Sequence, residues 1–533
     1  MIKNKFQKGY VMIMKKGFQL AALCLSVCMA VGGISGCKGG ENKAEGAKKT
    51  IHWVANVPNP DKADMVNFVE EKFDVDLVME TVSNTDALAV RFASGDIPDV
   101  FALYGSYNME KYQKQNLLAQ IPEDMLKAHA PTLLDIYEKD YTGTIPVMDY
   151  CKIDGKIYAL PSIEYSANFH IPIVYRGDWL KKLGIDKLPE TLDEFEKVAY
   201  QIANNDPDGN GVKDTYGIST SSMNVVYGAF GYQVGYDQSS IADTWRAEDG
   251  KLVFGPVQPK MKEALTILRK WYADGVLDPE YITGENTGGN VNISNAFLNG
   301  TIGITCQGNY SYYRPSFGEG TVAGPARTEM MKLNPEMADN IQIGLPPEGP
   351  HGDRGMFQWN MYNGSTGFGK QLDDDPDKLA KILDILEFGV SDYDNWCTMH
   401  YGIKGKHWEE SPIDGTPVMK DGYEINAIGA GSTFLSTIPP RYRRQAISEG
   451  VRKWTEENRL DEYGITNELL ITLPSEQKYT VELKKMQEEA YFQIITGLKP
   501  VDYFDEFVEK WHAAGGSILE KEANEWYTSI EKS

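Results

Sequence analysis

The residue types best suited to chemistry in this sequence lie in one short acidic stretch, Asp206-Pro207-Asp208-Gly209-Asn210-Gly211-Val212-Lys213-Asp214. Side-chain oxygens occupy its first, third, fifth and ninth positions, and glycines stand at the fourth and sixth. This spacing matches the start of a calcium loop, in which alternate residues turn inward and a glycine allows a sharp reversal. The alternative is an acidic turn without metal, because Asp, Asn, Gly and Pro favour turns for backbone reasons. The regular spacing favours calcium.

The segments around this loop differ from those of a calcium sensor. A helix is predicted before it, started by a capping box of Thr191 and Glu194. A strand is predicted after it, over residues 215–220, where a sensor has a second helix. Gly217 takes the twelfth position, at which a sensor has a bidentate Glu. We therefore interpret the loop as a structural site that stabilises its lobe.

The composition limits the classes of partner. The 533 residues include 53 Lys and Arg against 76 Asp and Glu, a formal net charge of −23. This balance argues against nucleic acid or an anionic membrane surface as the partner of the folded part. The 10 Trp, 30 Tyr and 19 Phe can fill cores, but Tyr and Trp also suit sites that stack on ligands.

The N-terminus has the pattern of a targeting segment. Lys15 and Lys16 precede an apolar run over residues 18–31, which is short for a membrane span and typical of a signal peptide. A second basic stretch lies upstream, so that Met1 and Met14 are alternative starts. Cys37 then follows Ser-Gly and precedes a polar tether. The pattern is similar to a bacterial lipoprotein signal and predicts a lipidated Cys37; an ordinary signal peptide that contains a cysteine is the alternative.

The mature chain begins with alternating strand and helix patterns. Strands are predicted over 51–57, 75–79 and 99–103, with helices between them over 65–73 and 87–92. This order indicates a parallel sheet, whose ligands meet the loops at the carboxyl ends of the strands. Further elements are predicted along the rest of the chain: a strand over 171–175, a helix ending at Gly275, a helical turn and strand over 296–304, a helix started by Asp375-Pro376, and a long helix over 475–496.

Five segments in order carry a family resemblance: the lipoprotein signal, residues 175–184, residues 189–195, the acidic loop and residues 401–408. The chain resembles the extracellular solute-binding lipoproteins of ABC importers in Gram-positive bacteria (family 1, sugar-binding), close to the LipO-like and alginate-oligosaccharide-binding branch. The resemblance implies a periplasmic-binding-protein-like α/β fold, with two discontinuous lobes around a ligand cleft and a hinge. The implied division is 1–36 signal peptide, 37–49 lipidated cysteine and tether, 50–168 with 345–400 first lobe, and 169–344 with 401–533 second lobe.

The resemblance also implies the function. The protein is expected to be a monomeric substrate-binding lipoprotein outside the cell membrane, attached by its lipid anchor alone. It would capture an oligosaccharide and deliver it to the transmembrane subunits of an ABC permease, without being an enzyme. In the family the acidic loop holds a structural Ca²⁺. The resemblance implies that its ligands here are Asp206, Asp208, Asn210, the Val212 carbonyl and Asp214. Thr215 stands where the alginate-binding relatives have a further acidic residue.

Side chains in loops expected to face the cleft are the candidates for contacting the sugar. Aromatic faces suit the apolar side of a sugar ring and planar polar groups suit its hydroxyls, which selects Trp53, Tyr104, Tyr165, Gln307, Asn309, Tyr310, Trp359 and Arg176. Each can instead be a core residue, and Arg176 with Trp179 can simply fix a helix to its lobe. Two other functions stay open: a binder of a peptide, polyamine or similar solute, and a secreted calcium-dependent glycan hydrolase with two carboxylates at the scissile bond.

Overall fold

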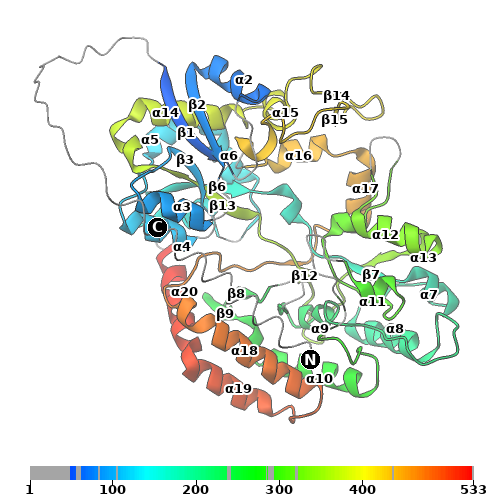
Figure 1. Ribbon diagram of the computed structural model, residues 1–533. Coiled ribbons are helices and arrows are strands. Elements are labelled where there is room, and N and C mark those ends of the chain that lie inside the picture. Colours follow the sequence, from blue (N-terminus) through cyan, green and yellow to red (C-terminus); the bar gives the residue numbers. More distant parts are fainter. Residues whose placement is uncertain are drawn as a thin grey trace, which may run out of the picture. The chain divides into compact units, whose positions relative to one another are not determined.

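A computed structural model describes residues 48–55, 62–81, 85–103, 106–143, 145–236, 242–283, 285, 293–317, 322–434 and 437–530 (Figure 1). The predictions for the signal peptide, the lipidated Cys37 and Tyr104 lie outside the described residues. Every helix within these ranges is too short or too polar to cross a lipid bilayer.

The first sheet has five strands in the order β2-β1-β3-β13-β6. Strands β1 (Lys49–Ala55), β2 (Val75–Thr81) and β3 (Val100–Leu103) are parallel to one another. They are connected by α2 (Asp64–Phe73) and α3 (Thr85–Ala93), so the predicted strand–helix alternation is confirmed. Two later strands complete the sheet in antiparallel pairing: β13 (Tyr362–Phe368) lies between β3 and β6 (Ala159–Ile163).

Helices cover the first sheet because each presents one apolar stripe to it. On α2 the buried side chains are Met65, Val66 and Val69. On α14 (Pro376–Phe388) they are Leu379, Ile382, Leu383, Ile385 and Leu386. Asp375 caps α14 as predicted, since its side chain accepts a hydrogen bond from the Lys378 N–H. Figure 1 shows α2 and α14 beside β1 and β2.

The second sheet has three short antiparallel strands in the order β10-β7-β11. They are β10 (Ile304–Thr305), β7 (Ile173–Tyr175) and β11 (Gln342–Gly344). The helix before the acidic loop is α8 (Leu192–Asn204), and the predicted capping box of Thr191 and Glu194 is present. The other helices of this region are α7 (Gly177–Lys182), α9 (Met223–Gly228), α10 (Lys260–Ala273), α11 (Asn295–Leu298), α12 (Pro325–Leu333) and α13 (Pro335–Asn340).

The strand predicted over residues 215–220 is not formed. Tyr216 pairs with Ile302, and Ile218 pairs with Leu277, each as an isolated bridge. The segment is held by two different neighbours in succession, which prevents a continuous ladder with either. The prediction of a strand after the acidic loop was therefore wrong, although the extended course of the backbone was anticipated.

The C-terminal region has three helices (Figure 1): α18 (Glu476–Ile495) and α19 (Tyr503–Trp511) lie side by side, and α20 (Ser517–Ile530) follows α19 after a kink at Gly515. The predicted long helix is α18, which ends before Gly497 in the left-handed conformation (φ 81°). A hairpin of β8 (Trp245–Glu248) and β9 (Lys251–Phe254) packs on this group, with the rings of Phe254 and Trp511 stacked at 5.2 Å.

The remaining helices and strands are short. They are α4 (Ser106–Lys114), α5 (Glu123–His129), α6 (Pro131–Lys139), α15 (Tyr393–Tyr401), α16 (Pro440–Ala446), α17 (Glu449–Glu457), β4 (Lys152–Ile153), β5 (Lys156–Ile157), β12 (Met356–Phe357), β14 (Trp408–Glu410), β15 (Pro417–Met419) and β16 (Gly464–Ile465).

Two hydrogen bonds bear on one boundary of the predicted lobes, and the division into lobes stays a prediction. His407 lies 2.7 Å from the Asp64 carboxylate, and the Ile438 N–H donates to the Ile163 carbonyl at 2.8 Å. These bonds connect His407 and Ile438 with the region of the five-stranded sheet, whereas the sequence-based division assigned both residues to the second lobe.

Candidate functional site

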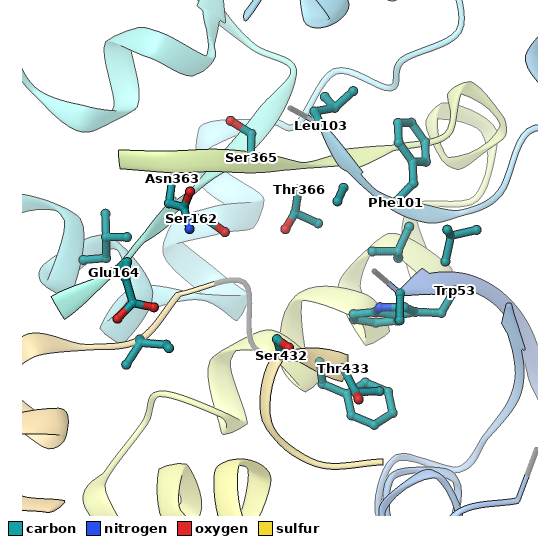
Figure 2. A pocket seen from close by; sticks show the side chains of 17 residues that line it. Trp53, Phe101, Leu103, Ser162, Glu164, Asn363, Ser365, Thr366, Ser432 and Thr433 are labelled. Atoms are coloured by element: carbon teal, nitrogen blue, oxygen red, sulfur yellow. The ribbon is translucent and has the colours of Figure 1, made fainter. Parts of the chain in front are cut away.

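A cavity of about 390 Å³ lies where β1 and β6 end and β13 begins. We call it the sheet cavity (Figure 2). Trp53 is almost fully buried in its wall, with its ring edge-on to Phe434 at 5.3 Å. The polar side chains of the wall are Ser162, Glu164, Asn363, Ser365, Thr366, Ser432 and Thr433. The sheet cavity therefore combines aromatic side chains with several hydroxyl groups, one amide and one carboxylate.

A second cavity, of about 330 Å³, shares Glu164 and Asn363 with the sheet cavity. We call it the amide cavity, because four of the side chains that line it are Asn309, Asn360, Asn363 and Asn467. The half-buried ring of Trp359 also lines it and contacts Phe357 edge-on at 5.4 Å. Since the two cavities have wall residues in common, we treat them together as the cleft.

Hydrogen bonds orient two of these amides. The Asn309 Oδ1 accepts from the Ser311 N–H at 3.0 Å. The Asn360 Oδ1 accepts from the Tyr141 hydroxyl at 2.7 Å and from the Tyr362 N–H at 2.9 Å. Because the oxygens are occupied, the NH₂ groups of Asn309 and Asn360 are the ends available as donors to a ligand.

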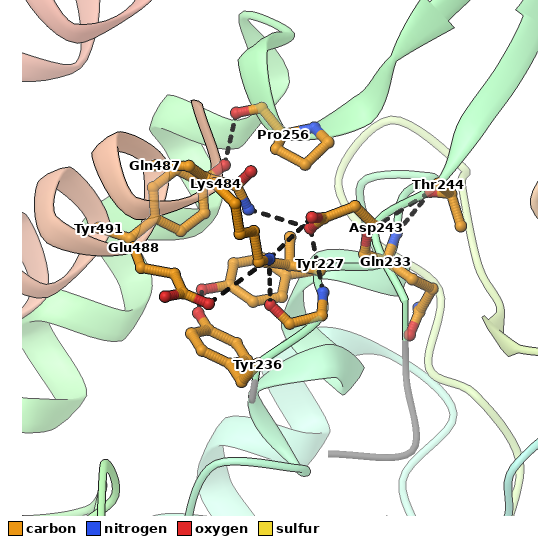
Figure 3. A network of polar contacts seen from close by, with 12 residues as sticks. Tyr227, Gln233, Tyr236, Asp243, Thr244, Pro256, Lys484, Gln487, Glu488 and Tyr491 are labelled. Atoms are coloured by element: carbon orange, nitrogen blue, oxygen red, sulfur yellow. Dashed lines mark hydrogen bonds and ion pairs between the residues drawn. The ribbon is translucent and has the colours of Figure 1, made fainter. Parts of the chain in front are cut away.

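The wall of the amide cavity continues into a polar network around Asp243, next to the wall residue Ala242 (Figure 3). The Asp243 carboxylate accepts from the Lys484 ammonium at 2.7 Å, from the Gln487 amide at 2.9 Å and from the Gly235 N–H at 3.1 Å. The network closes one side of a further cavity of about 340 Å³, which contains the aromatic rings of Trp245, Phe254 and Trp511. It fixes the loop before β8 to helix α18.

A fourth cavity, of about 350 Å³, has a different lining, and we call it the arginine cavity. Its polar side chains include Tyr165, Tyr310, Tyr312, Arg314 and Arg443. Tyr165 and Tyr310 both pack against Phe169, at 5.4 and 4.5 Å between ring centroids. Burial raises the pKa of the Tyr310 hydroxyl to about 12, so this group stays protonated and can donate or accept a hydrogen bond.

The structure separates the predicted ligand residues into three groups. Trp53, Asn309 and Trp359 line the cleft. Tyr165 and Tyr310 line the arginine cavity instead. Gln307 and Arg176 line none of these four cavities.

Gln307 and Arg176 are both buried and have close neighbours in sequence. Gln307 is 1% exposed, and its backbone carbonyl accepts from the Tyr313 hydroxyl at 2.5 Å. Arg176 is buried and forms two hydrogen bonds with Asp178, at 2.8 and 2.6 Å, over the ring of Trp179. The ion pair gives the Arg176 side chain a structural role, and the selection of both residues as ligand contacts stays a prediction.

Several lining residues were missed from sequence. Glu164, Asn360, Asn363 and Asn467 belong to the cleft. The signal for two of them was the motif Trp359-Asn360-Met361-Tyr362-Asn363, which places amides directly beside the selected tryptophan. Glu164 and Asn467 have no local signal, because they reach the cleft only through the tertiary fold.

The acidic loop is closed by hydrogen bonds to its own chain. The Asp206 carboxylate accepts from the N–H groups of Gly209, Asn210 and Gly211 at 3.0 to 3.2 Å. The Asn210 NH₂ donates to the carboxylates of Asp208 and Asp214, at 2.8 and 3.2 Å. Burial raises the pKa of Asp208, and the neighbouring carboxylates add to this effect. In the described part of the chain, no group of three or more His, Cys, Asp or Glu is arranged to hold a metal ion.

The donor set of the loop still suits calcium in its chemistry. Three carboxylates, one amide and the Val212 carbonyl offer oxygen atoms, the ligand type that this ion prefers. The Asn210 Oδ1 accepts from the Val212 N–H at 2.6 Å. A turn of this amide would therefore be required before its oxygen could face the same point as the carboxylates.

Two curated relatives from Bacillus subtilis (strain 168) are similar to this chain along nearly their whole length. Lipoprotein LipO is 24% identical over 93% of this chain and 96% of its own. The polygalacturonan/rhamnogalacturonan-binding protein YtcQ is 24% identical over 96% of this chain and 99% of its own.

Solved structures of solute-binding proteins share the fold of two α/β lobes. An HMO-binding, ABC-transporter-associated protein from Bifidobacterium longum infantis matches with a TM-score of 0.63 at 13% identity, over 91% of this chain and 99% of its own. The alginate-binding protein AlgQ2 matches with a TM-score of 0.58 at 16% identity, over 90% of this chain and 98% of its own. Residues 38–345 match the family model of the bacterial extracellular solute-binding proteins, and the chain belongs to this family.

Proposed function

We propose that this protein binds an oligosaccharide in the cleft and delivers it to an ABC permease. The observation that carries the proposal is the position of the half-buried Trp359 ring among the amides of the amide cavity. The names of the relatives support it, since YtcQ is a polygalacturonan/rhamnogalacturonan-binding protein. A structural neighbour, the solute-binding protein FusA, is solved in complex with kestose, with a TM-score of 0.56.

The chemistry of the cleft matches a sugar chain. Trp359 and Trp53 offer flat apolar surfaces for the C–H faces of pyranose rings. The asparagine NH₂ groups donate to sugar hydroxyls, while the oxygen atoms of Glu164 and Thr366 accept from them. Because the cleft is lined by segments from both sheet regions, ligand contacts would favour the closed form of the protein.

The proposal is tested by binding and by scattering. Thermal-shift screening of the purified chain against neutral, acidic and amino oligosaccharides, peptides and polyamines should give stabilisation by oligosaccharides alone. X-ray scattering at saturating ligand should show compaction. Stabilisation by peptides or polyamines without any by glycans would replace the sugar with another solute. Turnover of labelled oligosaccharides would favour a hydrolase.

Substitution of Trp359 locates the site. Trp359→Ala should weaken oligosaccharide binding about 30-fold, as expected for removal of a central aromatic contact worth about 2 kcal/mol. Trp526→Ala is the matched control, because Trp526 is also half-buried but stacks on Tyr150 outside the cleft. If both variants bind like the wild type in calorimetric titrations, the cleft is not the sugar site.

We also propose that the acidic loop binds Ca²⁺ as a structural ion. Asp206, Asp208, Asn210, the Val212 carbonyl and Asp214 would hold it, and its charge would balance the three carboxylates. Chelation should lower the melting temperature by several degrees, because an ion bound at 100 times its Kd stabilises by about 2.7 kcal/mol. Oligosaccharide affinity should change less than twofold. Loss of sugar binding with an unchanged melting temperature would contradict a structural role; magnesium is the control ion.

We further propose that a diacylated Cys37 holds the protein at the extracellular face of the membrane. Two acyl chains give stable attachment where one does not. Cys37→Ser should release the protein into the medium, whereas Cys151→Ser should leave it membrane-bound. Light scattering of the soluble form should give the mass of a monomer.

A further inference from the structure

The arginine cavity contains two guanidinium groups that form no ion pair with a carboxylate among the described residues. Arg314 and Arg443 line it, and no Asp or Glu is among its described lining residues. Neither arginine forms an ion pair with an acidic residue in the described part of the chain. In a protein with a net charge of −23, acids are abundant, so their absence from this wall is a specific property of the cavity.

The three arginines of helix α16 show the contrast most clearly. Arg441 pairs with Asp140 at 2.6 Å and Asp135 at 3.0 Å, and Arg444 pairs with Glu456 at 2.8 Å. Arg443 lies between them in sequence, and it donates a hydrogen bond to a neutral group, the Tyr401 hydroxyl, at 2.9 Å. Two guanidinium groups of this short helix are therefore paired with carboxylates. The third, that of Arg443, has no carboxylate partner and lines the cavity.

Arg314 has unused hydrogen-bonding capacity as well. One of its terminal nitrogens donates to the Val322 carbonyl at 2.9 Å. Its Nε is buried and has no hydrogen-bond partner among the described residues. A guanidinium has five N–H donors in a planar fork that fits a carboxylate with two parallel bonds. A buried donor without a partner costs free energy, which an incoming acceptor would recover.

We propose that the arginine cavity receives the carboxylate of an acidic sugar residue, such as a uronate, of the bound oligosaccharide. The three tyrosines supply flat surfaces for the ring of that residue. A small inorganic anion would use the arginines but not these surfaces. The cavity volume of about 350 Å³ lies within the range of small-ligand sites.

The position of the cavity connects it with the cleft, and the inference rests on the proposed function. Tyr165 directly follows Glu164, and Tyr310 directly follows Asn309, so consecutive residues line the two sites. Glu164 is the sole charged side chain among the described residues of the cleft. A carboxylate is thus disfavoured in the cleft beside Glu164 and favoured in the arginine cavity. This difference would fix the position of the acidic residue along the sugar chain.

The experiment compares each acidic oligosaccharide with its carboxyl-reduced neutral counterpart. Calorimetric titrations of the full mature chain would use galacturonate, mannuronate–guluronate and glucuronate oligomers of three to five residues. At least one acidic oligomer should bind about tenfold more tightly than its reduced form. Arg314→Gln and Arg443→Gln should each remove most of this difference, because they weaken binding of the acidic oligomer much more than binding of its reduced form.

Matched variants separate recognition from folding. Arg444→Gln removes a neighbouring arginine that does not line the cavity, and it should retain the preference for the acidic oligomer. Arg443→Lys keeps the charge without the planar fork and should retain part of it. Melting temperatures of all variants show whether the fold is intact.

Three results would overturn the inference. The first is equal affinity for acidic and reduced oligomers across the panel. The second is an equal loss of both affinities in the arginine variants. The third is that millimolar sulfate, which binds without sugar, displaces the acidic oligomer. Equal affinity for acidic and reduced oligomers, together with tight binding of neutral oligosaccharides, would reject this inference and support the proposed function. An absence of binding by every glycan would reject both.

Discussion

The Asp243–Lys484 network and the arginine cavity both hold charged groups away from bulk water. They differ in whether the charged group has an oppositely charged partner. Around Asp243, an ammonium, an amide and a backbone N–H satisfy the carboxylate at 2.7 to 3.1 Å (Figure 3). Around Arg314 and Arg443, the partners are one carbonyl and one hydroxyl. A balanced cluster stabilises the fold, whereas an unbalanced one lowers stability until a ligand completes it. The comparison distinguishes a structural from a functional use of charge.

The largest expected effect comes from breaking the balanced cluster. Lys484→Met leaves the Asp243 carboxylate with its two weaker donors and should lower the free energy of unfolding by about 2–3 kcal/mol, somewhat less than for a fully buried pair. Urea denaturation measures the difference. Lys485→Met is the control, because Lys485 is exposed and lies 3.8 Å from Glu489 on the same helix. Equal stability of the two variants would contradict the structural role of the network.

The pH dependence of the free energy of unfolding tests the surroundings of Arg443. Burial lowers the pKa of His400 to about 3, and the nearby charge of Arg443 adds to the shift. The unfolded chain therefore binds a proton near pH 6.5 that the folded chain does not bind. Stability should fall as the pH falls below about 6.5, by at most about 2 kcal/mol from this group between pH 7 and 5. The stability of His400→Gln should depend less on pH than that of the wild type between pH 7 and 5. Parallel plots of stability against pH for the two proteins would show that His400 does not cause the loss.

The smallest expected effect is the stability of the arginine variants. Arg314→Met removes a desolvated charge that has no acidic partner, so its free energy of unfolding should stay within about 0.5 kcal/mol of the wild type or rise. A loss of more than about 2 kcal/mol would show that Arg314 is a structural residue. Denaturation with guanidinium chloride measures this free energy of unfolding. Its high ionic strength screens the interactions between surface charges.

The parts of the fold that were predictable are those whose cause lies within a few residues. The capping box of Thr191 and Glu194, the cap at Asp375 and the helix end at Gly497 each depend on one helical turn. They were confirmed for that reason. The segment over 215–220 was misjudged because its pairing depends on two distant neighbours, at Leu277 and Ile302.

The candidate site was predictable only in part. Trp359 was selected because aromatic and amide residues are adjacent in sequence, and it does line the cleft. Arg176 was also selected, but it lines none of the four cavities and forms a local ion pair with Asp178, two residues away. Arg443 gave no signal, since three arginines on a short helix are typical of a solvated surface. Only the tertiary contacts of its two neighbours distinguish it.

Strand β13 has a consequence for how the protein must fold. It lies between β3 and β6, yet it follows them by about two hundred residues or more in the chain. Contacts so distant in sequence raise the contact order and slow folding. A chain that emerges from its amino end cannot close the first sheet, or form the wall that contains Asn363, until residue 368 is available. Vectorial folding of the first lobe alone is therefore ruled out, and an exported chain needs most of its length before it acquires affinity for its ligand.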